Sequence, residues 1–294
     1  MRVKIGTRSS ALALWQANYI AKRLKNEQNI DSEIIKIQTT GDKILDRPLD
    51  AIGGKGLFVK ELEVALKSGE IDVAVHSLKD VPVNLDEDLP LVAITERDSY
   101  FDVFLSKKYK NMFELPRHAK VGTTSARRSL QLKILRSDLD TQSLRGNVQT
   151  RLSRLEEGSF DAIVLAHAGL KRLDVLNNKF HAVILSSDLM IPAMGQGALG
   201  LQMLKDNKFY TNISALNCTK SALLCGIERE FVRLLGGTCQ SPLGVLADVT
   251  DGIYSLVAIL GIDKTHIKGQ VKSPNYETLA STLAQDFINR GARI

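Results

Sequence analysis

The chain has few aromatic residues and no long apolar run, and each shortage narrows what the protein can be. Aromatic residues make up only 5% of its 294 residues, and the basic residues are not interleaved with them. A stacking surface for single-stranded nucleic acid is therefore not expected. The apolar runs are shorter than a membrane-spanning helix requires, and no secretory signal stands at the start of the sequence. We expect a cytoplasmic protein that neither crosses a membrane nor binds nucleic acid.

Patterns typical of metal sites are missing as well. The three cysteines, Cys218, Cys225 and Cys239, are odd in number and too widely spaced for a zinc site, and the five histidines are scattered. In a reducing compartment these cysteines are expected to be thiols, with Cys218 and Cys225 buried in a helix. The net charge of +6 permits acidic ligands without selecting a class of them. No metal is expected.

Strand-like and helix-like segments alternate over the first two-thirds of the chain, which is typical of an α/β fold with mostly parallel sheets. The first series has strands at residues 3–7, 33–38 and 71–75 and helices at 10–25 and 56–67. A second series has strands at residues 101–106, 120–121 and 161–166 and helices at 129–135, 149–155 and 168–173. The restart indicates a second α/β domain of ordinary size.

The last third of the chain has a different pattern. A long helical segment over residues 212–235 leads into a stretch marked by glycine and proline. Three segments of alternating apolar and polar residues follow, at residues 243–249, 254–261 and 266–272. An amphipathic helix at residues 276–289 closes the chain. A strand meander followed by a helix is typical of a small α+β domain.

Two arginine-rich turns, at residues 122–128 and 143–151, are the most informative local feature. Each follows a strand-like run and opens a helical segment, where free backbone N–H groups favour anions. Four arginines in them offer forked donors for carboxylates or phosphates, namely Arg127, Arg128, Arg145 and Arg151. One such turn alone is usually a solvated basic face. Because cations oppose the helix dipole there, we expect them to serve an anion site rather than stability.

Polar residues also follow the apolar strand at residues 71–75. Ser77, Lys79 and Asp80 stand directly after it, and Asp80 can act as an acid, a base or a cation stabiliser. A structural Lys–Asp loop explains the segment about equally well. His76 is expected to be a hydrogen-bonded structural residue.

Two further segments are open to more than one interpretation. Residues 53–56 are rich in glycine but lack the spacing of a phosphate-binding loop, so a mobile loop is the better interpretation. Cys239 lies in a junction between a helix and a strand, where it is either an accessible nucleophile or an unreactive thiol.

Long stretches of the sequence resemble the porphobilinogen deaminases, also called hydroxymethylbilane synthases. The resemblance runs from end to end and rests on the Cys239 loop, both arginine turns and residues 7–10, 14–17, 53–62, 76–82, 168–173 and 192–197. It implies two α/β domains like those of periplasmic binding proteins, plus a small C-terminal α+β domain. The implied boundaries are residues 1–96 with 197–215, residues 100–190, and residues 219–294.

The resemblance also implies an activity. Members of this family are transferases that join four porphobilinogens, each with loss of ammonia, into linear hydroxymethylbilane for haem and other tetrapyrroles. A dipyrromethane cofactor, bound to Cys239 through a thioether, primes the reaction. The resemblance further implies a cytoplasmic monomer whose product passes to uroporphyrinogen-III synthase.

Residue roles follow from the matching positions. Asp80 would be the catalytic residue, contacting pyrrole N–H groups and stabilising the cation left when ammonia departs. The cofactor would be held by Cys239, Lys79, Asp80, Ser77, Thr123, Ser125, Arg127, Arg128, Arg145 and Gly169. Substrate carboxylates would be held by Arg8, Ser10, Arg145, Arg151 and Arg172. Lys55 and Phe58 would belong to a lid.

The sequence departs from the usual residues of the family at Thr238, Cys218 and His167, none of which belongs to the expected chemical core. Two other functions compete with the enzyme. The first two domains alone would suit a binding protein for a small anion, and the basic turns would suit a nucleic-acid binder. The missing export signal and the additional domain with Cys239 favour the enzyme over the binding protein.

Overall fold

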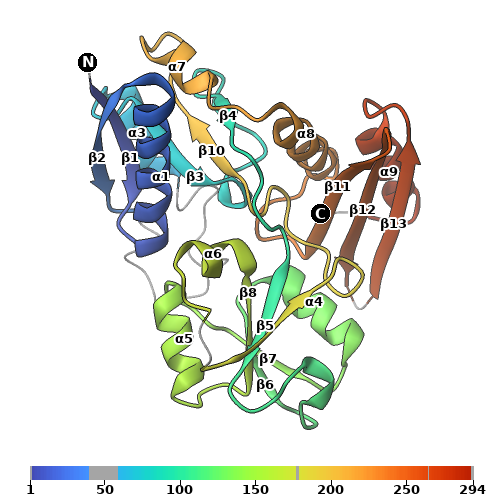
Figure 1. Cartoon of the computed structure of the whole chain (residues 1–294). Helices are drawn as coiled ribbons and strands as arrows, with labels where there is room; N and C mark the ends of the chain where they lie inside the picture. Colours follow the sequence, from blue (N-terminus) through green and yellow to red (C-terminus); the bar gives the residue numbers. More distant parts are fainter. Residues whose placement is uncertain (1, 40–58, 177–178, 264, 293–294) are drawn as a thin grey trace. The chain divides into compact units, whose positions relative to one another are not determined.

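The computed structural model describes residues 2–39, 59–176, 179–263 and 265–292 (Figure 1). The chain divides into two compact units, one formed by Met1–Asp98 with Ala198–Leu223 and the other by Ser99–Gly197 with Leu224–Ile294. Across the described residues, no helix is both long enough and apolar enough to cross a membrane.

The first unit contains a five-stranded mixed sheet with the order β2-β1-β3-β10-β4. Its strands are β1 (Arg2–Arg8), β2 (Asp31–Ile37), β3 (Val73–Ser77), β4 (Leu91–Ile94) and β10 (Leu199–Gln202). Strand β1 runs parallel to β2 and β3, whereas β10 runs antiparallel to β3 and β4. Helices of this unit are α1 (Ala11–Gln28), α3 (Lys60–Lys67) and α7 (Tyr210–Ser214).

Local chemistry explains where α1 begins, ends and packs. The Ser10 hydroxyl caps its start by accepting the Ala13 N–H at 3.3 Å, and Asn29 ends it in the left-handed conformation with φ 53°. The apolar stripe on the helix is buried in the core of the first unit, together with Val3 and Ile5 of β1.

The second unit contains another five-stranded mixed sheet, with the order β7-β6-β8-β5-β9. Its strands are β5 (Asp102–Ser106), β6 (Lys120–Gly122), β7 (Asp140–Gln142), β8 (Ala162–Ala166) and β9 (His181–Leu185). Strand β6 is parallel to β7 and β8, and β5 is antiparallel to β8 and β9. Helices α4 (Ala126–Leu135), α5 (Val148–Glu156) and α6 (His167–Arg172) follow β6, β7 and β8.

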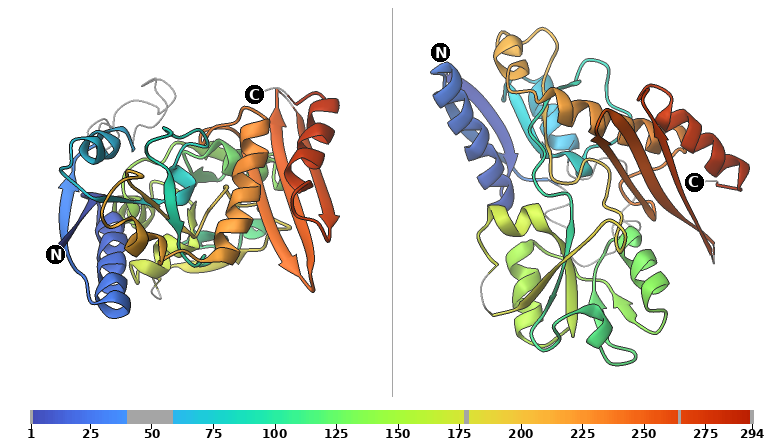
Figure 2. Two further views of the ribbon diagram at one scale, coloured as in Figure 1. Left: turned by 90° about the horizontal axis from the view of Figure 1, so that it is seen from above. Right: turned by 45° about the vertical axis from the view of Figure 1, so that its right-hand side comes forward.

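The same unit ends in a three-stranded antiparallel meander, β11 (Leu243–Thr250), β12 (Ile253–Ile262) and β13 (Thr265–Ser273). Helix α9 (Leu279–Asn289) lies along β12 and β13 (Figure 2). The packing is close, because a Cβ at Gly269 would come within 2.8 Å of the Phe287 ring. Phe287 in turn makes an edge-on contact with Phe231 of α8 (Thr219–Leu234), at 5.4 Å between ring centroids.

The predicted α/β class and the C-terminal meander with its helix are confirmed. The expectation of mostly parallel sheets is wrong for half of the strand pairs, since β10 and β5 each run antiparallel to both neighbours. The single helix expected over residues 212–235 is two helices, α7 and α8, interrupted where the Cys218 N–H donates to the Ile94 carbonyl at 2.8 Å. The three domain boundaries stay a prediction.

Candidate functional site

The end of strand β3 carries the segment with the expected catalytic residue. Ser77 is the last residue of β3, and Leu78–Asp80 forms one 3-10 turn, in which Leu78 is fully buried and its N–H donates to the Ala198 carbonyl at 3.0 Å. Lys79 and Asp80 are half-buried. The backbone is thus fixed by Leu78 while the Asp80 carboxylate stays within reach of a ligand.

Neighbouring strands of the first sheet bring other expected site residues to the same edge. Strands β1 and β3 are parallel, with Gly6 opposite Ala74, so Arg8 and Ser77 both lie at the carboxyl end of the sheet. Ser10 follows directly, at the start of α1. The carboxyl edge of parallel strands is where α/β proteins usually bind ligands.

A buried glutamine that was not predicted as a site residue holds Ser77 in place. Gln16 on α1 is 3% exposed, and its Nε2 donates to the Ser77 Oγ at 2.9 Å. The sequence did indicate such a contact, because Gln16 lies on the apolar face of a helix and a buried amide there requires a polar partner.

His76 is a buried structural residue, as expected. Its Nε2 lies 3.1 Å from the Gln202 Oε1, and Gln202 donates from Nε2 to the Glu63 Oε1 at 3.0 Å and to the Leu89 carbonyl at 2.9 Å. Because Oε1 only accepts, the ring must donate from Nε2. Burial lowers the pKa of His76 to about 4.

Lowering the pH from 6.5 to about 4 is expected to destabilise the first unit through His76. In that window the unfolded state binds a proton at this histidine and the folded state does not, so stability falls with pH, by up to about 3 kcal/mol. Urea unfolding across the window should show a shallower pH dependence for His76→Gln. The exposed His181 supplies the control, because His181→Gln should keep the wild-type slope.

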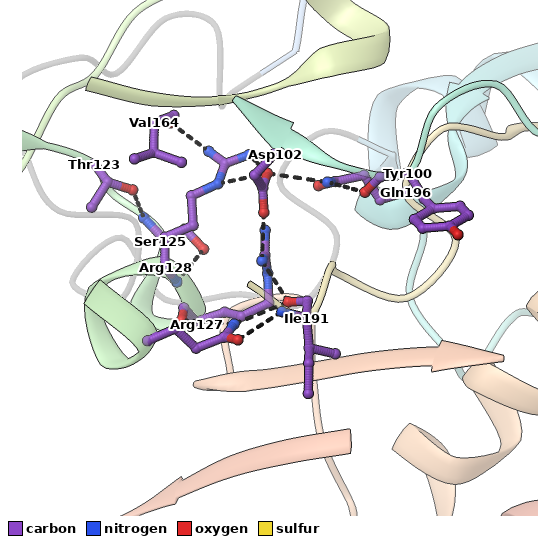
Figure 3. A network of polar contacts seen from close by, with 10 residues as sticks. Tyr100, Asp102, Thr123, Ser125, Arg127, Arg128, Val164, Ile191 and Gln196 are labelled. Atoms are coloured by element: carbon purple, nitrogen blue, oxygen red, sulfur yellow. Dashed lines mark hydrogen bonds and ion pairs between the residues drawn. The ribbon is translucent and has the colours of Figure 1, made fainter. Parts of the chain in front are cut away.

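In the second unit, two arginines and one aspartate form a buried ion cluster (Figure 3). Arg127 Nη1 lies 2.7 Å from the Asp102 Oδ2, and Arg128 Nη2 and Nε lie 2.7 Å and 3.0 Å from the Asp102 Oδ1. Asp102 is fully buried, and the two arginine side chains are only 4% and 7% exposed. Burial alone would raise the pKa of Asp102, but the charges of Arg127 and Arg128 outweigh it and hold that pKa far below its ordinary value.

This cluster corrects the view that arginines at the start of α4 have no part in stability. Both guanidinium groups pair with a carboxylate from β5, and that contact outweighs the unfavourable helix dipole. The interpretation as a solvated basic face is also wrong for Arg127 and Arg128. The sequence did indicate an ion pair here, because Asp102 is the first residue of an apolar strand and a buried acid requires a cation. All five residues of that strand, β5, are buried.

Further polar contacts hold the loop at residues 191–197 against the cluster. Gln196 Nε2 donates to the Asp102 Oδ1 at 3.1 Å and to the Tyr100 carbonyl at 2.8 Å. The buried Glu228 of α8 accepts the Gly195 N–H at 2.7 Å and the Ala247 N–H of β11 at 2.9 Å. Neither Gln196 nor Glu228 was predicted as a site residue, because a single polar residue in a sequence does not indicate a partner this far along the chain.

The hydroxyl residues of the first arginine turn shape the start of α4. Ser125 accepts the Arg128 N–H at 3.4 Å as the helix cap, and Thr123 accepts the Ser125 N–H at 3.2 Å. The Thr123 N–H itself donates to the Gln142 carbonyl at 2.8 Å. In these contacts both hydroxyl groups serve as acceptors.

In the second arginine turn, one buried donor has no partner among the residues that the structure describes. Asn147 caps α5 by accepting the Thr150 N–H at 2.9 Å, and Arg151 Nε donates to the Gly146 carbonyl at 2.8 Å. Arg145 Nη1 is buried, and in the part of the chain that the structure describes it has no hydrogen-bond partner. Such a group is costly unless a ligand accepts from it, and a carboxylate is a suitable ligand.

Helix α6 supplies two more of the expected residues. Gly169 is half-buried within it, and Arg172 ends it and donates from Nη2 to the Gly197 carbonyl. His167, one of the departures from the family, starts this helix with its Nδ1 2.9 Å from the Ser99 hydroxyl.

Cys239 is exposed and lies in an ordered turn between α8 and β11. Thr238 donates its N–H to the Ser241 Oγ at 3.0 Å and accepts the Gln240 N–H on its own hydroxyl at 3.2 Å. The departure at Thr238 therefore adds a contact that orders the turn. The expectation that Cys218 and Cys225 are both buried in a helix holds for Cys225, whereas Cys218 is half-buried and precedes α8.

The expected site residues are divided between the two units. Arg8, Ser10, Ser77, Lys79 and Asp80 belong to the first unit, and the remaining described ones belong to the second. Lys55, Phe58 and the glycine-rich loop at residues 53–56 lie outside the described residues. Among the side chains that are described, no group of three or more His, Cys, Asp or Glu could hold a metal ion.

Comparison with known proteins identifies the family. A family described as "Porphobilinogen deaminase, dipyromethane cofactor binding domain" matches residues 3–212, and "Porphobilinogen deaminase, C-terminal domain" matches residues 222–289. Porphobilinogen deaminase of Helicobacter acinonychis is 57% identical over 297 residues, which cover 99% of this chain and 96% of that protein. Porphobilinogen deaminase of Helicobacter hepaticus is 53% identical over 298 residues, covering 98% and 92%.

A solved structure of a periplasmic domain is also similar to this chain. The BvgS periplasmic VFT2 domain of Bordetella pertussis is 15% identical with a TM-score of 0.43, covering 73% of this chain and 85% of that one. The family, however, is established by the sequence matches, which extend over most of the chain. The chain belongs to the porphobilinogen deaminase family.

Proposed function

We propose that this protein is a transferase that joins four porphobilinogen molecules head to tail into hydroxymethylbilane, with loss of one ammonia for each. The reaction belongs to the synthesis of haem and other tetrapyrroles. Family membership over nearly the whole chain supports the reaction. The structural observation that carries the proposal is the exposed Cys239 thiol, held on an ordered turn of the unit that also contains the arginine turns.

The residues of this chain fit the dipyrromethane cofactor of the family. Its covalent attachment requires an accessible thiol, which Cys239 offers. Its acetate and propionate groups require donors, and the buried Arg145 Nη1 has no described partner to donate to. When bound, the dipyrromethane supplies the pyrrole carbon to which the first porphobilinogen is joined.

We assign the central chemical role to Asp80. Its half-buried carboxylate, fixed on the 3-10 turn after β3, is suited to accept hydrogen bonds from pyrrole N–H groups. As ammonia leaves, the substrate carbon becomes positively charged, and a nearby carboxylate lowers the energy of that charge and can accept the proton released later.

The basic and hydroxyl residues are assigned to carboxylate binding. Because every pyrrole carries two carboxylates, the growing chain is a polyanion, and arginine forks suit it. The cofactor is assigned to Lys79, Ser77, Thr123, Ser125, Arg127, Arg128, Arg145 and Gly169. Substrate is assigned to Arg8, Ser10, Arg145, Arg151 and Arg172, and the lid to Lys55 and Phe58.

We further propose that the protein acts in the cytoplasm as a monomer and passes its product to uroporphyrinogen-III synthase. Size-exclusion chromatography with light scattering tests the monomer, and a coupled assay with the second enzyme tests the hand-over.

Replacing Cys239 by serine is expected to abolish covalent cofactor and turnover together, because a hydroxyl is a far weaker nucleophile than a thiol. Intact-mass spectrometry of protein from a porphobilinogen-competent host should show a dipyrrole adduct on the wild type and none on Cys239→Ser. After incubation with porphobilinogen, the wild type should release ammonia and yield uroporphyrin, and Cys239→Ser should do neither.

The matched control is Cys218→Ser, which removes a thiol on another segment and should keep both the adduct and the activity. An unmodified Cys239 in freshly prepared wild-type protein would refute the cofactor assignment. That result is also what a non-enzymatic anion-binding protein predicts, so one measurement separates the two functions.

The nucleic-acid alternative is disfavoured by the burial of two of its four arginines. Arg127 and Arg128 pair with Asp102 and are only 4% and 7% exposed, so they offer too little surface to the extended phosphate backbone of a nucleic acid. Binding to nucleic acid would fall steeply with salt, and its absence at moderate salt would remove this function.

A further inference from the structure

Arg127 and Arg128 meet at one carboxylate although their positions on the helix direct them apart. Successive residues of an α-helix are rotated by about 100°, and two like charges repel. Asp102 overcomes both effects by giving one oxygen to each guanidinium, at 2.7 Å in each case (Figure 3). Gln196 fixes this carboxylate further by donating to its Oδ1.

The two guanidinium groups are used to different extents. Arg128 places Nε and Nη2 on the Asp102 Oδ1 and Nη1 on the Val164 carbonyl. Arg127 uses only Nη1, which donates to Asp102 and to the Ile191 carbonyl. Its Nε and Nη2 donate to no group in the described ranges, although the side chain is 4% exposed. These two N–H groups form one edge of the fork that binds carboxylates in a bidentate manner.

The charges of the cluster do not balance. Two guanidinium groups face one carboxylate, and their other described partners, the backbone carbonyls of Ile191 and Val164, are neutral. One positive charge is therefore left over in a buried place, where an unpaired charge is costly. A purely structural ion pair would need only one arginine, so the surplus favours a second anion as a ligand.

We propose that Asp102 is a positioning residue, which turns Arg127 so that its Nε–Nη2 edge stays available for one carboxylate of the cofactor. The surplus positive charge supplies the attraction. The identity of the ligand rests on the proposed function, whereas the orientation of Arg127 is a property of the chain itself.

Exchange of the arginine Nε–H protons with solvent tests the orientation without any assay of activity. The probe is the full chain, labelled with ¹⁵N at arginine and made in a host that produces no porphobilinogen. Signals are assigned with Arg127→Lys and Arg128→Lys. The two side chains are buried to a similar extent, so a difference in exchange reports the hydrogen bond of Nε. We expect slow exchange for Arg128, whose Nε donates to Asp102, and faster exchange for Arg127, which should slow once porphobilinogen has been added and the cofactor has formed.

Asp102→Asn keeps the size of the side chain and removes its charge. We expect Arg128 to become fast-exchanging, and the rate of adduct formation with porphobilinogen, followed by intact mass, to fall about 10- to 100-fold. The control is Asp138→Asn, which breaks the half-buried pair with Arg136 at the other end of α4 and should leave that rate unchanged.

The outcomes separate this proposal from the proposed function. Equal exchange of Arg127 and Arg128 in the cofactor-free wild type would overturn the positioning role, and this holds even where Asp102→Asn fails to fold. Wild-type loading speed in a folded Asp102→Asn would overturn it as well. A wild type with the expected exchange pattern that never forms the adduct would instead refute the function and, with it, the cofactor as ligand.

Discussion

Asp80→Asn is expected to lower turnover by about 10²- to 10⁴-fold, the range in which a positioned acid–base group contributes to catalysis. Asparagine keeps the size of the side chain but cannot carry the negative charge that stabilises the cation formed as ammonia leaves. The fold should persist, because the buried Leu78, not Asp80, anchors the turn. Steady-state assays of porphobilinogen consumption and ammonia release measure the effect.

A matched variant separates the role of Asp80 from a general effect of removing a carboxylate. Asp86 pairs with Lys67 on the surface of the same unit, and neither carries a proposed role. Asp86→Asn should therefore retain wild-type turnover. If Asp80→Asn released ammonia at a near-normal rate, Asp80 would not be the catalytic residue and the Lys79–Asp80 segment would be a structural loop.

Periodicity predicted helices that bury one face, and continuous apolar runs predicted strands that are buried throughout, such as β5 and β8, but neither pattern gives the direction of a strand. Strand β10 is a four-residue segment with no signal of orientation in its own letters. Its antiparallel pairing with β3 depends on partners more than 100 residues away in the sequence. The strand-like run expected before the second arginine turn is the short edge strand β7, although its three residues, Asp140–Gln142, show no hydrophobic alternation.

The candidate site was predicted as a set of residue types, whereas its electrostatics depend on tertiary contacts. An arginine at a helix start suggests an anion, but only the folded chain shows that Arg127 and Arg128 share Asp102, which precedes them by about 25 residues. Arg145 fits the expected pattern better, since its buried Nη1 lacks a described partner. The role of these arginines as carboxylate donors stays a prediction, whereas the Asp102 carboxylate that holds Arg127 and Arg128 was not predicted.

Asp102→Ala is expected to lower the free energy of unfolding of the second unit by about 3–5 kcal/mol, because it leaves two buried guanidinium groups without a carboxylate. Arg127→Leu should cost less, about 1–3 kcal/mol, since Arg128 and Asp102 remain as a neutral pair. Its effect on function should be larger than its effect on stability, because the proposed carboxylate donor is lost and cofactor assembly is expected to stop. Urea unfolding and intact-mass spectrometry of both variants test this contrast, and a holoprotein of normal mass and activity from Arg127→Leu would contradict it.

Acid should narrow the stability difference between the wild type and Asp102→Asn. In the folded state the pKa of Asp102 is held far below its ordinary value. As the pH falls, the unfolded state therefore binds a proton at this group before the folded state does, at about pH 4. Its contribution to stability is thus fully present above that pH and is lost progressively as the pH falls toward the depressed folded value. Urea unfolding of both proteins at neutral pH and at steps below pH about 4 should give converging free energies. A difference that stayed constant through that range would show that Asp102 contributes through its shape and hydrogen bonds rather than through its charge.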